Sequence, residues 1–227
     1  METSLHQELK GRFGTGTGGR EEVALGGYRI DAVAGDGELF EVQSGALGPL
    51  REKLGRLLPG SRVRVVKPVA VARRVVRRAR RDGADLSTRY SPKRGAVVDV
   101  FDDLTGLAKV FPHPNLGIDV LAVEVDEVRV SRTRWPGYAV VDRRLHKVVA
   151  AVPLRVAADL WGLLPATPDG RFTTRDLAEL LARPLDFAQR VAYCLRHAGA
   201  VDAVGKAGNR RVYLRNEGST PSGLQRT

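Results

Sequence analysis

Apolar and polar residues in the first third of the chain form a regular series of helix and strand patterns. Residues 4–10 predict a short helix, residues 30–43 predict two strands joined by a Gly-rich turn, and residues 62–66 begin a further strand. The segment 46–58 predicts a second helix, because its leucines recur at helical spacing: Leu47, Leu50, Leu54, Leu57 and Leu58. The order helix, strand, strand, helix, strand indicates an α/β fold.

Three polar side chains interrupt the apolar positions of the two strands in residues 30–43. Asp31 lies on the first strand, and Glu41 and Gln43 share one face of the second, because side chains alternate along a strand. An antiparallel hairpin brings Asp31 near Glu41, and two carboxylates suit Mg²⁺ (or Mn²⁺), which prefers oxygen ligands. The pattern favours a metal site for phosphodiester hydrolysis. In the alternative, Asp31 is simply an exposed strand residue and Glu41 pairs with an arginine such as Arg29.

The spacing of these residues resembles a known signature. Asp31, nine intervening residues and then Glu41-x-Gln43 are similar to the Asp…(Asp/Glu)-x-Lys motif of the PD-(D/E)xK nuclease superfamily. The resemblance implies a restriction-endonuclease-like mixed sheet flanked by helices over residues 1–150. It also implies that Asp31 and Glu41 hold the catalytic metal, that Gln43 orients the attacking water, and that Glu8 contacts the metal or a bound water.

The chain departs from this signature at Gln43, where the superfamily usually has lysine. A neutral amide forms hydrogen bonds but carries no charge to stabilise the phosphate. Two functions therefore stay open: a metal-dependent DNA endonuclease, which is a hydrolase, and a non-catalytic DNA-binding protein on a degenerate nuclease fold.

Positive charge supports a nucleic-acid partner. The chain has 37 Lys and Arg against 26 Asp and Glu, a net charge of +11, and this balance favours a polyanion, DNA before a membrane surface. Residues 73–81 contain six Arg in nine positions, and guanidinium groups suit phosphates. We predict phosphate contacts from Arg73, Arg74, Arg77 and Arg78, and a second basic contact from Lys93 and Arg94 beside a turn-rich loop over 82–93. A solvated charged face is the alternative.

The middle of the chain has less distinctive patterns. Residues 62–72 predict a strand interrupted at Pro68, residues 97–110 an amphipathic helix, and residues 116–130 a long strand. The apolar stretch 145–152 fits either a helix or a strand. The formal dinucleotide fingerprint Gly14-x-Gly16-x-x-Gly19 is rejected, because no strand precedes it and no clear helix follows it.

From about residue 153 the pattern becomes helical. Helices are predicted over 154–164, 175–181 and 185–197, with Thr173 or Thr174 as the N-cap of the second, and strands over 201–204 and 210–214. Helix, turn, helix and hairpin resemble an α+β winged-helix domain over residues 151–215. The whole arrangement resembles that of uncharacterised bacterial proteins.

The winged-helix resemblance implies a DNA-binding surface. It places Gln189, Arg190 and Tyr193 toward the major groove, and Lys206, Arg210 and Arg211 at or near the wing. Docking of this segment onto a partner protein is the alternative.

Composition also bears on location and assembly. Cys194 is the single cysteine, so no intramolecular disulfide forms, and residues 1–20 lack an apolar signal-peptide core. No apolar run reaches transmembrane length, and we expect a cytoplasmic protein without membrane contact. Residues 216–227 are predicted to be a disordered tail. Whether the protein forms a homodimer stays open.

Overall fold

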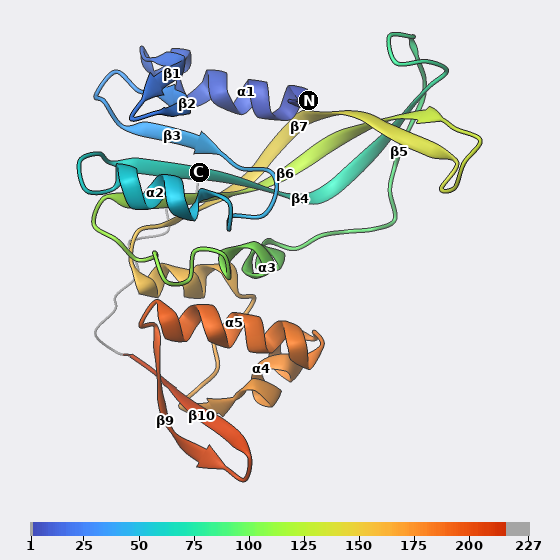
Figure 1. Cartoon of the computed structure of the whole chain (residues 1–227). Coiled ribbons are helices and arrows are strands. Elements are labelled where there is room, and N and C mark those ends of the chain that lie inside the picture. Colours follow the sequence, from blue (N-terminus) through green and yellow to red (C-terminus); the bar gives the residue numbers. More distant parts are fainter. Residues whose placement is uncertain (1, 217–227) are drawn as a thin grey trace. The chain divides into compact units, whose positions relative to one another are not determined.

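The computed structural model describes residues 2–216 and contains two β-sheets with flanking helices (Figure 1). The larger is a mixed seven-stranded sheet in the order β1-β2-β3-β4-β6-β7, with β5 paired to β4. The smaller has three strands in the order β8-β10-β9. The mixed sheet and its flanking helices confirm the predicted α/β class.

Helices and strands occur throughout the chain, and β4, β6 and β7 are the longest strands. The first part contains α1 (Ser4–Phe13), η1 (Thr15–Thr17), β1 (Arg20–Leu25), β2 (Tyr28–Val33), β3 (Leu39–Val42), α2 (Leu50–Leu57), β4 (Val63–Arg78) and β5 (Asp85–Tyr90). The middle contains η2 (Val97–Val100), α3 (Phe101–Leu104), β6 (Leu116–Ser131) and β7 (Tyr138–Leu154). The last part contains η3 (Ala157–Leu163), β8 (Arg171–Thr173), α4 (Thr174–Leu181), α5 (Leu185–His197), β9 (Val201–Ala207) and β10 (Arg210–Arg215).

The described residues divide into two compact units. Unit 1 comprises residues 2–44, 66–97 and 120–151, and unit 2 comprises residues 45–65, 98–119 and 152–216. The chain enters unit 2 for the last time at Val152, beside the boundary predicted after residue 150. Two internal segments, which the linear prediction assigned to the first domain, also belong to unit 2. The predicted tail at 216–227 lies outside the described residues, except for Asn216.

In unit 1, helix α1 covers one face of the sheet. Leu5 and Leu9, four residues apart on the helix, are buried against sheet residues. Phe13, one turn further, stacks on Phe40 of β3 with ring centroids 5.0 Å apart. The sheet side of this cluster consists of Ala32, Phe40, Val42, Val66, Leu121, Val123 and Val125.

In unit 2, local signals position the final helices. The Thr173 hydroxyl accepts from the backbone N–H of Arg175 and Asp176, while the Asp176 carboxylate accepts from Thr173 N–H at 2.7 Å, a reciprocal cap. Helix α5 spans the predicted residues 185–197. Gly199 follows it with φ +79°, a conformation that glycine adopts without steric cost.

Several predicted elements differ in the structure. Strand β4 continues through Pro68, because the proline φ is compatible with extended backbone and removes only one N–H donor. Residues 85–90, predicted within a loop, form β5 by antiparallel pairing with β4 (Val76↔Thr88) although their side chains are all exposed and mostly polar. Strand β1 was not predicted, and residues 145–152 belong to the long strand β7.

Two predicted helices are shorter or tighter than expected. Of residues 97–110, only 97–104 are helical. The chain turns at Gly106, where an added Cβ would lie 2.4 Å from Gly48 N, so this close approach requires glycine. The segment predicted at 154–164 is a 3₁₀ helix over Ala157–Leu163.

Burial of α1 predicts a large cost for truncating its apolar face. Leu9→Ala removes a side chain that is 0% exposed, and it should lower the free energy of unfolding by about 2–5 kcal/mol. The midpoint of urea denaturation, followed by circular dichroism, measures the change. Gln7→Ala, on the exposed side of the same helix, is the control and should leave the midpoint nearly unchanged. Equal midpoints for the two variants would contradict the packing of α1.

Candidate functional site

Asp31 lies where β2 and β3 cease to pair through their backbones. The antiparallel ladder joins Ala32 to Phe40 and Val33 to Leu39. Immediately beyond it, the N–H of Val42 donates to Asp31 Oδ2 at 2.9 Å. The Asp31 carboxylate therefore replaces a backbone carbonyl as the acceptor in this hydrogen bond, and the bond links β2 to β3.

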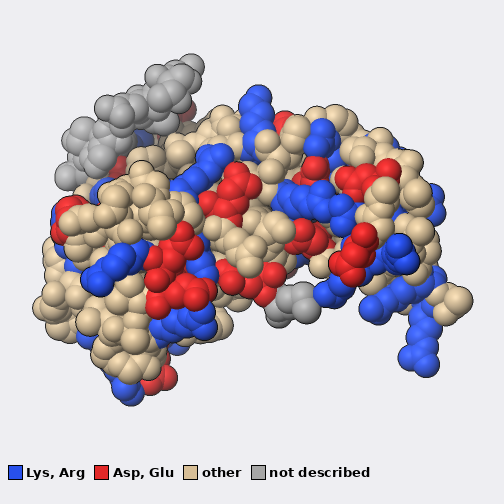
Figure 2. Space-filling model, turned by 90° about the horizontal axis from the view of Figure 1, so that it is seen from above, with Lys and Arg blue, Asp and Glu red and all other residues tan. Residues whose placement is uncertain are grey.

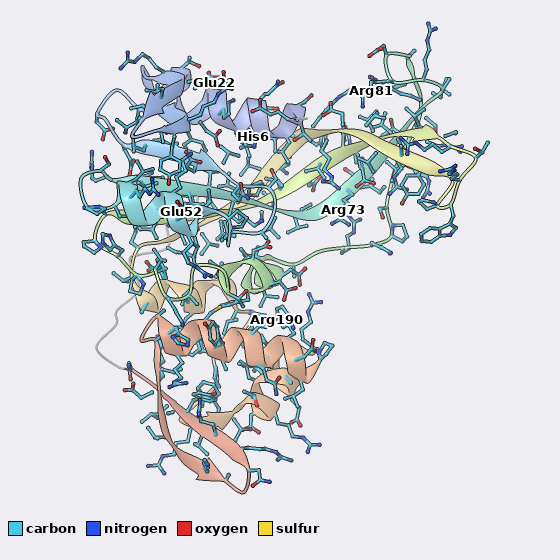
Figure 3. All side chains as sticks on the ribbon, in the orientation of Figure 1. His6, Glu22, Glu52, Arg73, Arg81 and Arg190 are labelled. Atoms are coloured by element: carbon cyan, nitrogen blue, oxygen red, sulfur yellow. The ribbon has the colours of Figure 1, made fainter. Side chains whose placement is uncertain are left out.

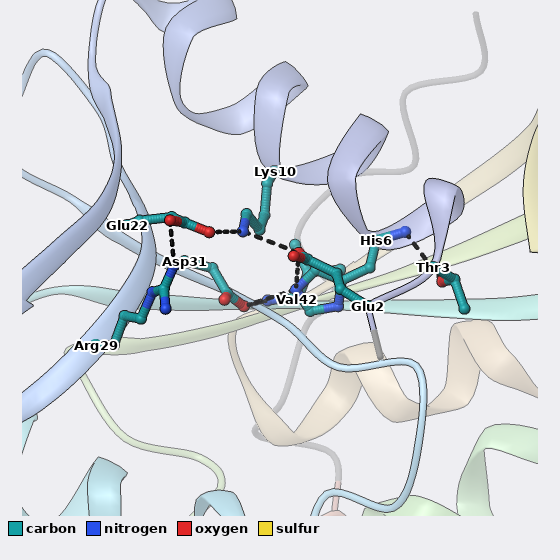
Figure 4. Close-up of polar contacts among 8 residues, drawn as sticks. All are labelled: Glu2, Thr3, His6, Lys10, Glu22, Arg29, Asp31 and Val42. Carbon is teal, nitrogen blue, oxygen red and sulfur yellow. Dashed lines mark hydrogen bonds and ion pairs between the residues drawn. The ribbon is translucent and has the colours of Figure 1, made fainter.

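Helix α1 presents a polar stripe to this carboxylate (Figure 4). His6 and Lys10 are four residues apart and lie along one side of the helix, and Glu2 precedes the N-cap residue Thr3. His6 Nε2 lies 3.4 Å from both Asp31 Oδ2 and Glu2 Oε1. Lys10 Nζ lies 2.8 Å from carboxylate oxygens of Glu2 and Glu22.

Glu22 closes this arrangement from β1. It binds Lys10 and the guanidinium of Arg29, and its backbone has φ +57°, which is uncommon for a residue other than glycine. We call Glu2, His6, Lys10, Glu22, Arg29 and Asp31 the Asp31 network. The Lys10 side chain is only 5% exposed. Its burial would lower its pKa, but hydrogen bonds from Lys10 to Glu2 and Glu22 give a net pKa above the ordinary value.

The surroundings of Asp31 favour its ionised form. Burial alone would raise the pKa of this carboxyl group, but hydrogen bonds from His6 and from Val42 N–H, together with the positive charge of Lys10, outweigh burial. The net pKa of Asp31 lies below its ordinary value. The carboxylate is therefore a stable negative charge at neutral pH.

The other predicted catalytic residues lie in different settings. Glu41 is 5% exposed and Gln43 is half-buried, with its N–H bound to Val66 O of β4. Glu8 is exposed and pairs with Arg12 one turn along α1 at 3.3 Å. The structure therefore brings His6, and not Glu8, to Asp31. Within residues 2–216, no three His, Cys, Asp or Glu side chains lie close enough together to form a metal-binding group.

Three of the predicted nucleic-acid contacts are ion-paired within the protein. Arg74 makes two hydrogen bonds to Asp126, at 2.6 and 2.7 Å. Arg78 binds Asp85 at 2.5 Å. Arg190, labelled in Figure 3, binds Asp102 of α3 and Asp186 of its own helix.

Of the remaining basic positions near the Arg-rich segment, Lys93 and Arg94 are exposed. Lys93 and Arg94 lie in a turn, and the guanidinium of Arg94 lies 5.5 Å from the ring centroid of Tyr90. Arg73 is half-buried on β4, at the start of the Arg-rich segment that ends at Arg81 (Figure 3). Over much of the face seen in Figure 2, basic and acidic side chains lie side by side. Net charge therefore overstates how much positive surface is available to a ligand.

Unit 2 contains a basic groove between helices and hairpin. The groove has a volume of about 940 Å³ and lies between α4, the start of α5 and the β9–β10 hairpin. Its lining includes the acidic Glu179 and the basic and amide residues Arg175, Arg183, Gln189, Lys206, Asn209, Arg210 and Arg211. Arg175 pairs with Glu179 and Arg183 with Asp99, whereas no ion pair within residues 2–216 involves the hairpin residues Lys206, Arg210 and Arg211.

Sequence reasoning found the hairpin side of this groove and missed its α4 side. It also missed the contacts of His6 and Lys10, although their spacing of four residues in a predicted helix was an available signal.

Residues 3–155 match the model of a family described as a domain of unknown function, DUF8091. The chain belongs to this family. The DUF8091 match contains every member of the Asp31 network except Glu2, and it ends three residues after the chain enters unit 2 for the last time. An uncharacterised protein of Treponema pallidum (strain Nichols) is 33% identical over 182 residues, which cover 78% of this chain and 72% of that protein. No solved structure matches the chain.

Among the described residues of this DUF8091 protein, no helix has both the length and the apolar character needed to cross a membrane.

The lowered pKa of Asp31 predicts acid-dependent stability. Because the pKa of Asp31 is lower in the folded state than in the unfolded state, the unfolded chain binds more protons at pH values near these two pKa values. The stabilisation is present above the ordinary Asp pKa of about 3.9 and is lost as pH falls through the folded value. Asp31→Asn should therefore lose less stability than the wild type between about pH 5 and about pH 2, measured by urea denaturation at each pH. Glu8→Gln, which removes an exposed carboxylate from α1, is the control and should keep the wild-type dependence. Identical dependence in the wild type and Asp31→Asn would contradict the Asp31 network.

Proposed function

We propose that this protein binds DNA through the basic groove of unit 2, and that it does so in the cytoplasm. The observation that carries the proposal is the cluster of Lys206, Arg210 and Arg211 on the β9–β10 hairpin, lining one groove with Gln189 of α5. The order β8, α4, α5, β9, β10, with β10 between the other two strands, agrees with the expected winged helix and supports it.

The exposed residues of α5 indicate how this segment would contact a duplex. Gln189 and Tyr193 are four residues apart and both exposed, with Tyr193 39% exposed. In winged-helix domains this helix enters the major groove and the hairpin contacts backbone or minor groove. We assign base contacts to Gln189 and Tyr193, and phosphate contacts to the hairpin. Arg190, expected among the base contacts, instead holds α5 to α3 through Asp102.

The Asp31 network favours a non-catalytic role for the DUF8091 domain. Oδ2 of Asp31 accepts from Val42 N–H and contacts His6, so part of this carboxylate serves the fold. Gln43 has no charge to replace the usual lysine. In this proposal the DNA-binding segment follows the family domain in the chain, and the family domain does not catalyse hydrolysis.

Removal of the hairpin charges tests the basic groove. Arg210→Gln with Arg211→Gln should weaken binding of a short labelled duplex by about tenfold and reduce the salt dependence of binding, because each phosphate contact contributes about 0.9 to the slope of log K against log salt. Fluorescence anisotropy at several salt concentrations measures both. Arg20→Gln with Lys147→Gln removes the same charge from exposed positions of unit 1 and is the control. Equal weakening by both pairs would exclude the groove as a specific site.

A metal-dependent deoxyribonuclease is the second candidate. The observation that favours it is the β2–β3 register, which, continued by one residue beyond Ala32↔Phe40, sets Asp31 opposite Glu41. Two carboxylates are enough for Mg²⁺, which commonly takes one or two from the protein and completes its shell with water and phosphate. When bound, such an ion would activate a water for phosphodiester hydrolysis. Asp31 and Glu41 would hold it, and Gln43 would orient the water.

Cleavage assays separate the two candidates. If the protein is a nuclease, supercoiled DNA should be cut with Mg²⁺ or Mn²⁺ and not with EDTA, and Asp31→Ala and Glu41→Ala should each lower the rate at least about a hundredfold while DNA binding stays. Glu8→Ala should retain cleavage, because Glu8 pairs with Arg12 on the exposed side of α1. DNA binding without cleavage under all these conditions would eliminate the nuclease and leave the first proposal.

A further inference from the structure

A second basic pocket lies within unit 1, remote in sequence from the groove residues. It has a volume of about 250 Å³ and is lined by Arg77 of β4, Arg89 of β5, Arg129 and Ser131 of β6, and Tyr138 of β7. We call this site the arginine pocket.

Strand pairing explains why these arginines converge. Val75 lies opposite Arg89, and Arg77 lies opposite Ser87, in the antiparallel β4–β5 ladder. Directly opposed residues share a face of the sheet, as do residues two apart on one strand. Arg77 and Arg89 therefore emerge on the same face, although twelve positions separate them in the sequence.

The third arginine is held rigidly by its own contacts. The Arg129 guanidinium lies 3.9 Å from the ring centroid of Tyr138, and its nitrogens lie 2.6 and 2.7 Å from Glu127 Oε1. Stacking and a carboxylate partner fix one edge of the planar group. Ser131, two residues further on β6, adds a hydroxyl donor to the pocket.

Charge in the arginine pocket is not balanced by the protein. Glu127 offsets one of the three guanidinium charges. The neighbouring carboxylates of Asp126 and Asp85 are bound to Arg74 and Arg78. Within residues 2–216, Arg77 and Arg89 take part in no ion pair. Two positive charges therefore face one small cavity, an arrangement that calls for an anion.

We propose that the arginine pocket binds one phosphodiester group of the DNA backbone, a contact separate from the basic groove. Guanidinium groups match phosphate oxygens in planar, bidentate geometry, and a hydroxyl donor completes such a site. The volume is below the roughly 300–1,000 Å³ of pockets that enclose whole small-molecule ligands. It therefore suits one group of a longer polymer better than a free nucleotide. The DNA assignment rests on the proposed function, whereas the affinity for phosphate does not.

The test removes the two unpaired charges and leaves the stacked one. Arg77→Gln with Arg89→Gln is the pocket variant, Arg129 stays in place to preserve the fold, and Arg20→Gln with Lys147→Gln is the charge-matched control in the same unit. The first measurement is the melting temperature in inorganic phosphate and in chloride at equal ionic strength. Phosphate raises the melting temperature of proteins in general by exclusion from their surface, so the quantity of interest is the difference between pocket variant and control. The second is the affinity for a short DNA duplex against salt.

We expect the pocket variant to lose the additional stabilisation by phosphate that the control and the wild type show, since a ligand stabilises only the state that binds it. We also expect it to bind DNA about tenfold more weakly, with a salt slope smaller by about 1, the contribution of one phosphate. The same phosphate response in pocket variant and control would overturn the phosphate site. Loss of the phosphate response with an unchanged DNA slope would overturn the polymer assignment in favour of a small phosphorylated molecule. Failure of the wild type to bind DNA at all would instead refute the proposed function, and the phosphate measurement would still decide the pocket.

Discussion

Unit 1 depends on the placement of α1 against the sheet. One side of this helix buries Leu5 and Leu9 in an apolar cluster, and the adjoining side carries His6 and Lys10 into the edge of the same contact. A nearly buried ammonium costs several kcal/mol unless it is paired. The pairing of Lys10 with Glu22 meets this need, and β1 accommodates it with an uncommon backbone conformation at Glu22. Apolar packing and the Asp31 network therefore position the helix together.

The arginines of this protein serve two purposes. Some neutralise carboxylates within a unit, such as Arg74 with Asp126, and join strands or helices. Others converge on cavities without a carboxylate partner among the described residues, as Arg77 and Arg89 do. The same residue type on β4 thus pairs with a carboxylate at Arg74 and lines a cavity at Arg77, because strand residues an odd number of positions apart point to opposite faces.

Local interactions made part of the fold predictable. Helix α5 and the Thr173 cap follow from apolar spacing and from a hydrogen-bond pattern within four residues. Strand β5 was missed because its residues are mostly polar and all exposed, and only pairing with β4 makes them a strand. Long-range contacts also decide which residue of α1 lies next to Asp31. Glu8 and His6 are two residues apart, so they lie on nearly opposite sides of α1, and choosing between them requires knowing which side meets the sheet.

The sequence by itself determined the α/β class and the extent of the last helices, because each of these depends on periodicity or on short-range spacing. Only the tertiary structure decided which charges are already paired, that Asp31 contacts His6 and Val42, and that three arginines from three strands share one pocket. Those outcomes depend on strand register and on which side of a helix is buried. Register is set by contacts between residues far apart in the chain, and a shift of one residue exchanges the two faces of a strand.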